Sequence, residues 1–216
     1  MRDAAVRRGD RRWGYADVED PSVFVAFTIV ESPHPELVGA HLLGWTTTPW
    51  TLISNCGVAV APEAMYVTVE HAGSASVARG GTTQDVVPRM LGRVGRPFDG
   101  ATLVGTRYEP LCPNVEGAHR VVAADFVSLE DGTGVVHLAP AFGPEDLEIG
   151  RREGVGDVQA ARRRGPVHRR APAFVRGEFF KDADEAIIAP TCARAGCCCG
   201  PERSSRYPCA GGATRR

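Results

Sequence analysis

The amino-acid sequence predicts a β-rich α/β domain of compact, barrel-like form. Short runs of β-branched and aromatic residues recur up to about residue 140, and proline and glycine residues separate them. Few stretches have the spacing of apolar residues that an amphipathic helix needs. Strands are expected at residues 23–30, 40–48, 57–61, 65–70, 103–108, 119–127 and 134–139.

Turn-forming and helix-forming residues set the limits of these elements. The strand at 40–48 should end before Pro49, because proline cannot donate to a sheet ladder. The pair Asp131-Gly132 favours a hairpin turn between the last two strands. A helix is predicted at 144–153, with proline in its first position and acids in its first turn. Shorter helical segments are expected around 85–91 and from Asp182.

The composition excludes several classes of protein. None of the 216 residues belongs to an apolar run of eighteen or more, and the start lacks a secretory signal, so a cytoplasmic protein without a membrane span is expected. The seven cysteines are an odd number and crowd near the end, without the paired spacing of a zinc ribbon. The single lysine, Lys181, lies in no phosphate-binding loop. No metal or other cofactor is expected.

A threonine-rich segment ends the strand predicted at 40–48. Thr46 and Thr48 would lie on one face of the strand, and Thr47 on the other. Hydroxyl groups on one face could position a water molecule or a ribose hydroxyl. Threonine is also common in strands for steric reasons, and from this segment alone that explanation is favoured.

A histidine and an acid follow in the strand at 134–139 and the helix after it. Val136 and Leu138 form the more apolar face, which should face the core. His137 then lies among small residues on the other face, where a ligand could approach, although an ordinary strand histidine is slightly favoured. Asp146 falls in the first helical turn, where the helix dipole stabilises an acid. That structural role is favoured, and the alternative is a carboxylate that holds a substrate ammonium group.

Together these segments resemble the editing domain of isoleucyl-tRNA synthetases. Residues 43–52 (LGWTTTPWTL), followed by Asn55, are similar to the threonine-rich motif of that family, and Thr48 stands where the valyl and leucyl relatives have arginine. Residues 132–143 (GTGVVHLAPAFG), followed by Asp146, are similar to its second editing motif. The start and the return of that domain resemble YADVEDPSV (15–23) and FFKDAD (179–184). Ile53 departs from the pattern, since the family usually has proline there.

The resemblance implies an aminoacyl-tRNA deacylase. Valine and isoleucine differ by one methylene, which is too little for one hydrophobic pocket to discriminate, so the family uses a second site that admits valine and excludes isoleucine. The expected partner is the 3′ end of isoleucine tRNA that carries valine. The expected chain is a monomer, with the remainder of the synthetase as a further partner if it is encoded separately.

The resemblance also implies roles for particular residues. The predicted catalytic residues are Thr46, Thr47, Thr48 and Asp146, and the predicted substrate-binding residues are Asn55, His137 and Trp50. The threonines would surround the terminal ribose and the attacking water, and Asp146 would hold the α-ammonium group. His137 would line the side-chain pocket, and Asn55 would shape the adenosine side. The ATP-binding signatures of the synthetase core are absent, so binding of ATP and magnesium is not expected.

The predicted organisation has four parts. These are a flexible N-terminus at 1–14, the editing domain at 15–154, a degraded C-terminal part at 155–188, and an irregular Cys/Arg/Gly-rich tail at 189–216. The arginine-rich stretches 155–170 and 189–216 match nothing in the family, and we interpret them as frame-shifted or truncated coding sequence. Two alternatives to an active hydrolase therefore stay open: a binding-only module for the aminoacylated 3′ end, and an inactive remnant.

Overall fold

The fold is described from a computed structural model. The structure describes residues 14–20, 22–71, 73–81, 93–112, 117–130, 132–156, 187 and 203–209. For residues 14–20, 71 and 203–209 it describes the backbone only. The strands are β1 (Gly14–Asp20), β2 (Val23–Glu31), β3 (His41–Thr46), β4 (Gly57–Val60), β5 (Met65–His71), β6 (Ser74–Arg79), β7 (Arg93–Val94), β8 (Phe98–Asp99), β9 (Arg107–Tyr108), β10 (Val121–Ala123), β11 (Val135–Leu138) and β12 (Arg203–Cys209). The helices are α1 (Pro144–Glu153) and the 3₁₀ segments η1 (Pro35–Leu37), η2 (Pro49–Ser54) and η3 (Gly100–Leu103).

The largest sheet has seven strands and is mixed. Its order is β7-β5-β6-β3-β2-β9, with β8 also paired to β5. The pairs are antiparallel except β3 with β6, which run parallel. The prediction of a β-rich α/β fold is therefore confirmed, but the described strands do not close into a barrel.

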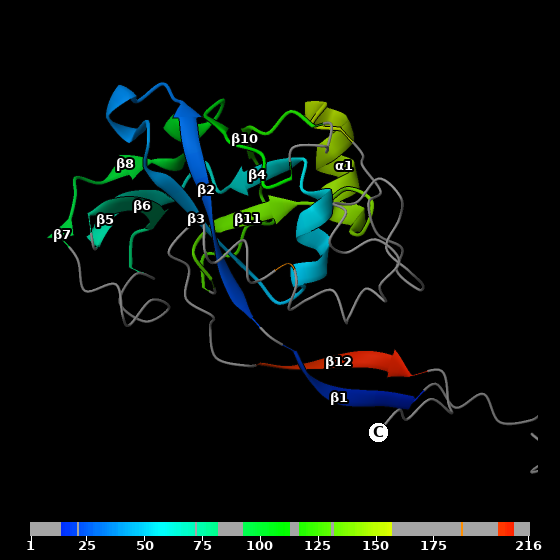
Figure 1. The fold of residues 1–216 in the computed structure, drawn as a ribbon. Helices are drawn as coiled ribbons and strands as arrows, with labels where there is room; N and C mark the ends of the chain where they lie inside the picture. The colour runs from blue at the N-terminus through cyan, green and yellow to red at the C-terminus, as the bar shows by residue number, and fades with distance from the viewer. Residues whose placement is uncertain are drawn as a thin grey trace, which may run out of the picture.

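A second sheet of three strands carries part of the site. Its order is β10-β4-β11, in which β10 is parallel and β11 antiparallel to β4. Figure 1 shows these strands beside α1. The predicted hairpin between β10 and β11 is wrong, because β4 lies between them. The turn at Gly132, whose φ is 75°, reverses the chain without pairing its neighbours.

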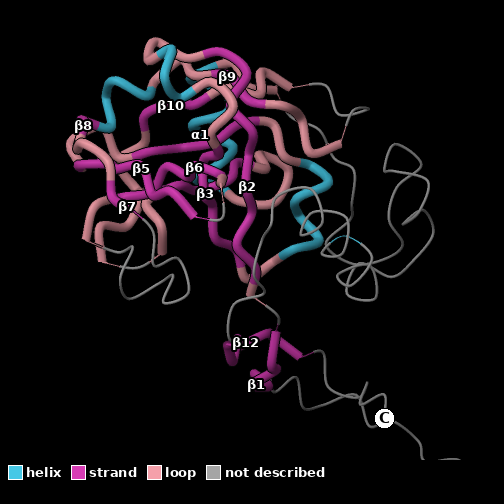
Figure 2. Tube along the Cα trace, turned by 60° about the vertical axis from the view of Figure 1, so that its left-hand side comes forward, coloured by secondary structure: helices cyan, strands magenta, loops and turns pink. Residues whose placement is uncertain are grey.

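The third sheet is a two-stranded antiparallel ribbon of β1 and β12. Figures 1 and 2 show the ribbon apart from the larger sheets. The expectation of an irregular tail is wrong for residues 203–209, since these form β12. Both strands of a two-stranded ribbon are edge strands, and edge strands are where sheets accommodate proline. Pro208 is therefore compatible with β12.

The core forms where β2 is covered on both faces. Val23, Val25, Phe27 and Ile29 belong to the main buried cluster, which also contains the residues of β4 from Val58 to Val60. Phe24 belongs to a second cluster with Leu43 and Ala78. A strand covered on both faces is expected to read as a continuous apolar run, as β2 does.

Most of the predicted elements are present, with some differences in extent. The helix at Pro144–Glu153 and strands at the positions of β2, β3, β4 and β5 are confirmed. The predicted strand 103–108 is wrong for its first half, where η3 ends, and 119–127 is a strand only at Val121–Ala123. Strand β6 was not expected. The helical turn at 85–91 lies outside the described residues, as does the helix from Asp182 apart from Ile187, which is helical. No described helix is long and apolar enough to cross a membrane.

Candidate functional site

A chain of hydrogen bonds joins the threonines at the end of β3 to a histidine in β11. Thr46 Oγ1 and Thr48 Oγ1 are 3.3 Å apart, and Thr48 Oγ1 is 3.3 Å from Thr51 Oγ1. Thr51 Oγ1 lies 3.0 Å from His137 Nε2. Strand β3 ends at Thr46, and the polypeptide turns at Thr48 into η2, which begins at Pro49 and brings Thr51 back toward Thr48.

The positions of the protons follow from these contacts. Thr51 Oγ1 donates to the carbonyl oxygen of Thr48 at 2.7 Å, so its single proton is used there. The contact between Thr51 and His137 is then a hydrogen bond that Nε2–H of the imidazole donates. His137 is therefore the tautomer with its proton on Nε2, and Nδ1 carries a lone pair.

His137 is held in its neutral form by its surroundings. Burial lowers the pKa of His137 from 6.5 to about 4, because the charged imidazolium would lose its hydration. Its Nδ1 atom is buried and has no hydrogen-bond partner among the described residues. The site thus contains an uncharged histidine with one acceptor atom that the described protein does not use.

The expected alternation of faces in β11 holds only in part. Val135 and Leu138 are buried in the core, whereas Val136 and His137 are half-buried. Val136 packs against the core cluster, as predicted, although it is only half-buried. Val135, on the opposite face, is also a buried member of that cluster, which the prediction did not anticipate.

Asp146 is bound to the chain just after the end of β11. Its Oδ2 atom accepts a hydrogen bond of 2.9 Å from the backbone N–H of Ala139, two residues after His137. Burial raises the pKa of the Asp146 carboxyl, the hydrogen bond from Ala139 lowers it in part, and the charge of Glu145 raises it further. Asp146 lies in the first turn of α1, so the helix dipole favours its charged form.

Three elements that carry these residues are fixed to one another. The ring centroids of Trp50, in η2, and Phe142, before α1, are 4.8 Å apart, and the two rings make a T-shaped contact. The backbone N–H of Cys56 donates to the carbonyl of Leu138 at 2.9 Å, which ties the chain after η2 to the end of β11. Figure 1 shows η2, in cyan, beside β11 and α1.

The remaining predicted residues lie at different places around this cluster. Thr47 is half-buried, and its hydroxyl forms no hydrogen bond with the described residues. Trp50 is buried, with 7% of its surface exposed. Asn55 is 2% exposed, and both ends of its amide are bound to protein atoms. The roles of these residues toward a ligand stay predictions. Thr51 was not among the predicted site residues, although its position three residues after Thr48 was a signal that could have identified it.

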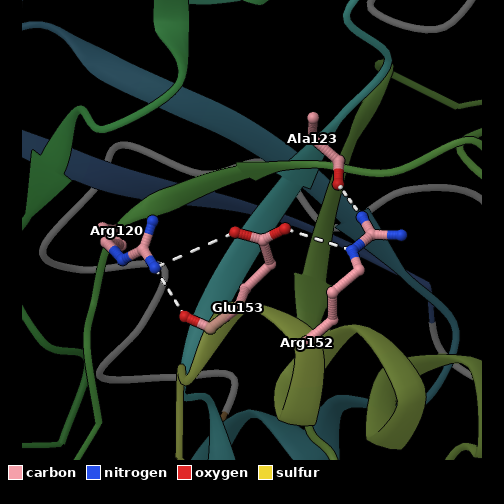
Figure 3. Close-up of polar contacts among 4 residues, drawn as sticks. All are labelled: Arg120, Ala123, Arg152 and Glu153. Carbon is pink, nitrogen blue, oxygen red and sulfur yellow. Dashed lines mark hydrogen bonds and ion pairs between the residues drawn. The ribbon is translucent and has the colours of Figure 1, made fainter.

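The far end of α1 is anchored to β10. Arg120 Nη2 donates to the backbone carbonyl of Glu153 at 2.6 Å, and Arg152 Nη2 donates to the carbonyl of Ala123 at 3.0 Å (Figure 3). The Glu153 carboxylate lies between the two guanidinium groups, 3.9 Å from Arg120 and 3.1 Å from Arg152. The anchor ties the C-terminal end of α1, the helix that carries Asp146 in its first turn, to the chain around β10.

No group of three or more His, Cys, Asp or Glu side chains in the described part of the chain could hold a metal ion. The cysteine-rich segment 192–199 lies outside that part.

Comparisons with known proteins relate the chain to one class of enzyme. No protein-family model matches it. It is 42% identical over 184 residues to the isoleucine--tRNA ligase of Thermobifida fusca (strain YX), and 39% identical over 179 residues to that of Thermus thermophilus. These alignments cover 82% and 81% of this chain, but 17% and 16% of the two relatives. The chain therefore spans about one sixth of the length of these relatives.

Solved structures give a likeness of fold. GlLeuRS-CP1 matches with a TM-score of 0.66 and 12% identity, over 84% of this chain and 99% of that one. The editing domain of the cytosolic leucyl-tRNA synthetase from P. falciparum matches with a TM-score of 0.50 and 9% identity, over 62% and 67%. At such identities the likeness concerns the fold alone.

Proposed function

We propose that this chain, which belongs over about four fifths of its length to the isoleucine--tRNA ligase family, hydrolyses the ester between a wrongly attached amino acid and the 3′ end of tRNA. The proposal concerns hydrolysis and not ligation, because the chain spans 17% and 16% of two relatives that are ligases as whole proteins. Hydrolysis of this ester consumes only water.

The observation that carries the proposal is the hydrogen-bond chain from Thr46 through Thr48 and Thr51 to His137. An ester is reactive enough that a well-placed water and stabilisation of the developing oxyanion can account for catalysis. The threonine hydroxyls are suited to both tasks. The hydroxyls of Thr47 and Thr48 would orient the water and the ribose.

Asp146 gives the site its preference for an amino-acid ester. Its carboxylate is fixed by the N–H of Ala139, and a fixed carboxylate in partly buried surroundings attracts an α-ammonium group. In the proposal this contact orients the carbonyl carbon toward the water held by the threonines.

We further propose that the substrate is valine attached to isoleucine tRNA. The imidazole of His137 is fixed by Thr51 and is neutral, so it forms a wall of constant position beside the site. A fixed wall can exclude isoleucine by its one additional methylene, whereas a mobile one would yield. The kinship with isoleucine--tRNA ligases supports this choice of tRNA.

The test is release of valine from valyl-tRNA that is specific for isoleucine, by the purified full chain. We expect release of valine, little release of isoleucine from the correct aminoacyl-tRNA, and loss of activity in Asp146→Ala. Asp146→Asn is the matched control for folding, because its amide oxygen can still accept from Ala139. Binding of valyl-tRNA by the folded chain without hydrolysis would contradict the proposal and support a binding-only module.

A further inference from the structure

A buried hydrogen bond lies behind the site and ties it to the edge of the large sheet. The hydroxyl of Tyr108, in β9, donates to Oδ1 of Asn55 at 2.7 Å. The Nδ2 group of Asn55 donates to the carbonyl of Gly57 at 2.8 Å. Because that carbonyl can only accept, the amide has one consistent orientation, and the tyrosine must be the donor.

Both residues are buried in the folded chain. Asn55 and Tyr108 are each 2% exposed. The Tyr108 ring lies between the rings of Phe27, at 5.0 Å, and His119, at 5.8 Å. The Tyr108 hydroxyl and both ends of the Asn55 amide are hydrogen-bonded to protein atoms.

The pair nevertheless holds the elements that carry the site. The backbone N–H of Asn55 donates to the carbonyl of Leu52 and ends η2, in which Thr51 lies. The next residue, Cys56, donates to the carbonyl of Leu138, adjacent to His137. The same Cys56 accepts from the N–H of His119, and Tyr108 donates its own N–H to the carbonyl of His119. Asn55 therefore stands where η2, β11 and β9 are joined.

We propose that Asn55 and Tyr108 are positioning residues that hold Thr51 against His137, and that Asn55 acts through this hydrogen bond and not by contact with substrate. Loss of the tyrosine hydroxyl leaves Oδ1 of Asn55 buried without a donor, so the end of η2 must shift to regain one. A small shift there changes the Thr51–His137 distance. The catalytic consequence rests on the proposed hydrolase function, but the structural link does not.

The experiment compares Tyr108→Phe with Thr106→Val in the full chain. Thr106 is a matched control, because its hydroxyl is also buried and lies two residues away, but bonds to Ser32 at 3.1 Å. The first readout is the ¹⁵N and ¹H NMR signals of the His137 imidazole, assigned with His137→Gln. We expect Tyr108→Phe to change these signals and Thr106→Val to leave them as in the wild type.

The second readout is valyl-tRNA hydrolysis. Tyr108→Phe and Asn55→Ala should each lower kcat on the order of tenfold to a hundredfold with little change in KM, and the double variant should lose no more than either alone. Unchanged His137 signals in a folded Tyr108→Phe variant would overturn the proposal. It would also be overturned if Asn55→Ala raised KM while Tyr108→Phe hydrolysed valyl-tRNA like the wild type. A wild-type chain without hydrolysis would refute only the proposed function, because the NMR comparison still decides this one.

Discussion

The hydroxyl of Thr51 and the Nε2 atom of His137 are 3.0 Å apart although 86 positions separate them in the sequence. The threonine donates to the carbonyl of Thr48 and accepts from the imidazole. One side chain therefore fixes the tautomer and the position of the histidine. A histidine so fixed can act as a rigid wall or as an acceptor through Nδ1, but not as a general base through Nε2.

Replacing Thr51 by valine should weaken both stability and hydrolysis. The variant keeps the shape of the side chain but leaves Nε2–H of His137 without its acceptor, which should cost about 1–2 kcal/mol of unfolding free energy. Valyl-tRNA hydrolysis should fall by about tenfold or more, since the histidine is no longer fixed. Thr51→Ser keeps the hydroxyl and should retain most of both. Wild-type hydrolysis by Thr51→Val would show that the hydrogen bond has no part in catalysis.

His137 should make the fold less stable in mild acid. Its pKa is about 4 in the folded chain and 6.5 without burial, so the unfolded chain takes up a proton that the folded chain does not. The contribution of neutral His137 to the free energy of unfolding is fully present above pH 6.5. It is lost as the pH decreases toward 4, which lowers the free energy of unfolding by about 3 kcal/mol at most. His41, whose pKa burial also lowers, acts in the same direction. Asp146 acts in the opposite one, because its pKa is raised.

Urea unfolding between pH 7 and pH 4 measures this effect. His137→Gln is the control, because glutamine can still donate to Thr51 and does not titrate. The difference between the two proteins isolates His137 from His41 and Asp146. Parallel pH curves for the wild type and His137→Gln would refute the assignment of a neutral histidine at this position.

Elements with strong local signals could be predicted from the sequence. Helix α1 begins at Pro144 with acids in its first turn and ends at Gly154, whose φ is 64°. Strand β2 is an apolar run that is buried on both faces. The order of strands in the sheets was harder to predict. Strand β4 lies between β10 and β11, although the turn residue Gly132 suggested that these two strands pair directly. Which strands are neighbours depends on long-range packing, and a local turn residue does not encode it.

The same limit applies to the site. The threonines, His137 and Asp146 could be named because they occur in two recognisable segments. Thr51 could have been noticed from its spacing to Thr48, but its bond to His137 joins residues far apart along the chain, as does the bond of Tyr108 to Asn55. Their residue types are ordinary for a strand or a 3₁₀ turn. Only the folded arrangement brings the hydroxyl of each to its partner.

Asp146→Asn should reveal whether the carboxylate holds an ammonium group. The variant keeps an acceptor for Ala139 and removes the charge, so folding should be retained. Hydrolysis of valyl-tRNA should fall on the order of a hundredfold, because a charge-assisted contact that orients the substrate is lost. The matched substrate is the same tRNA with a deaminated valine, isovaleryl-tRNA. Its slow hydrolysis should be unchanged by Asp146→Asn, and an equal loss on both substrates would mean that Asp146 does not bind the amine.

The anchor between α1 and β10 should depend on Arg120 more than on the Glu153 carboxylate. Arg120 donates at 2.6 Å to the last backbone carbonyl of α1, where a cation is also favoured by the helix dipole, whereas its distance to the carboxylate is 3.9 Å (Figure 3). Arg120→Met should therefore lower the free energy of unfolding by about 1–2 kcal/mol in urea denaturation. Glu153→Gln should cost less than about 0.5 kcal/mol, because half-exposed ion pairs contribute little and glutamine can still accept from Arg152. Equal losses in the two variants would mean that the ion pair, and not the cap on the carbonyl, holds the helix in place.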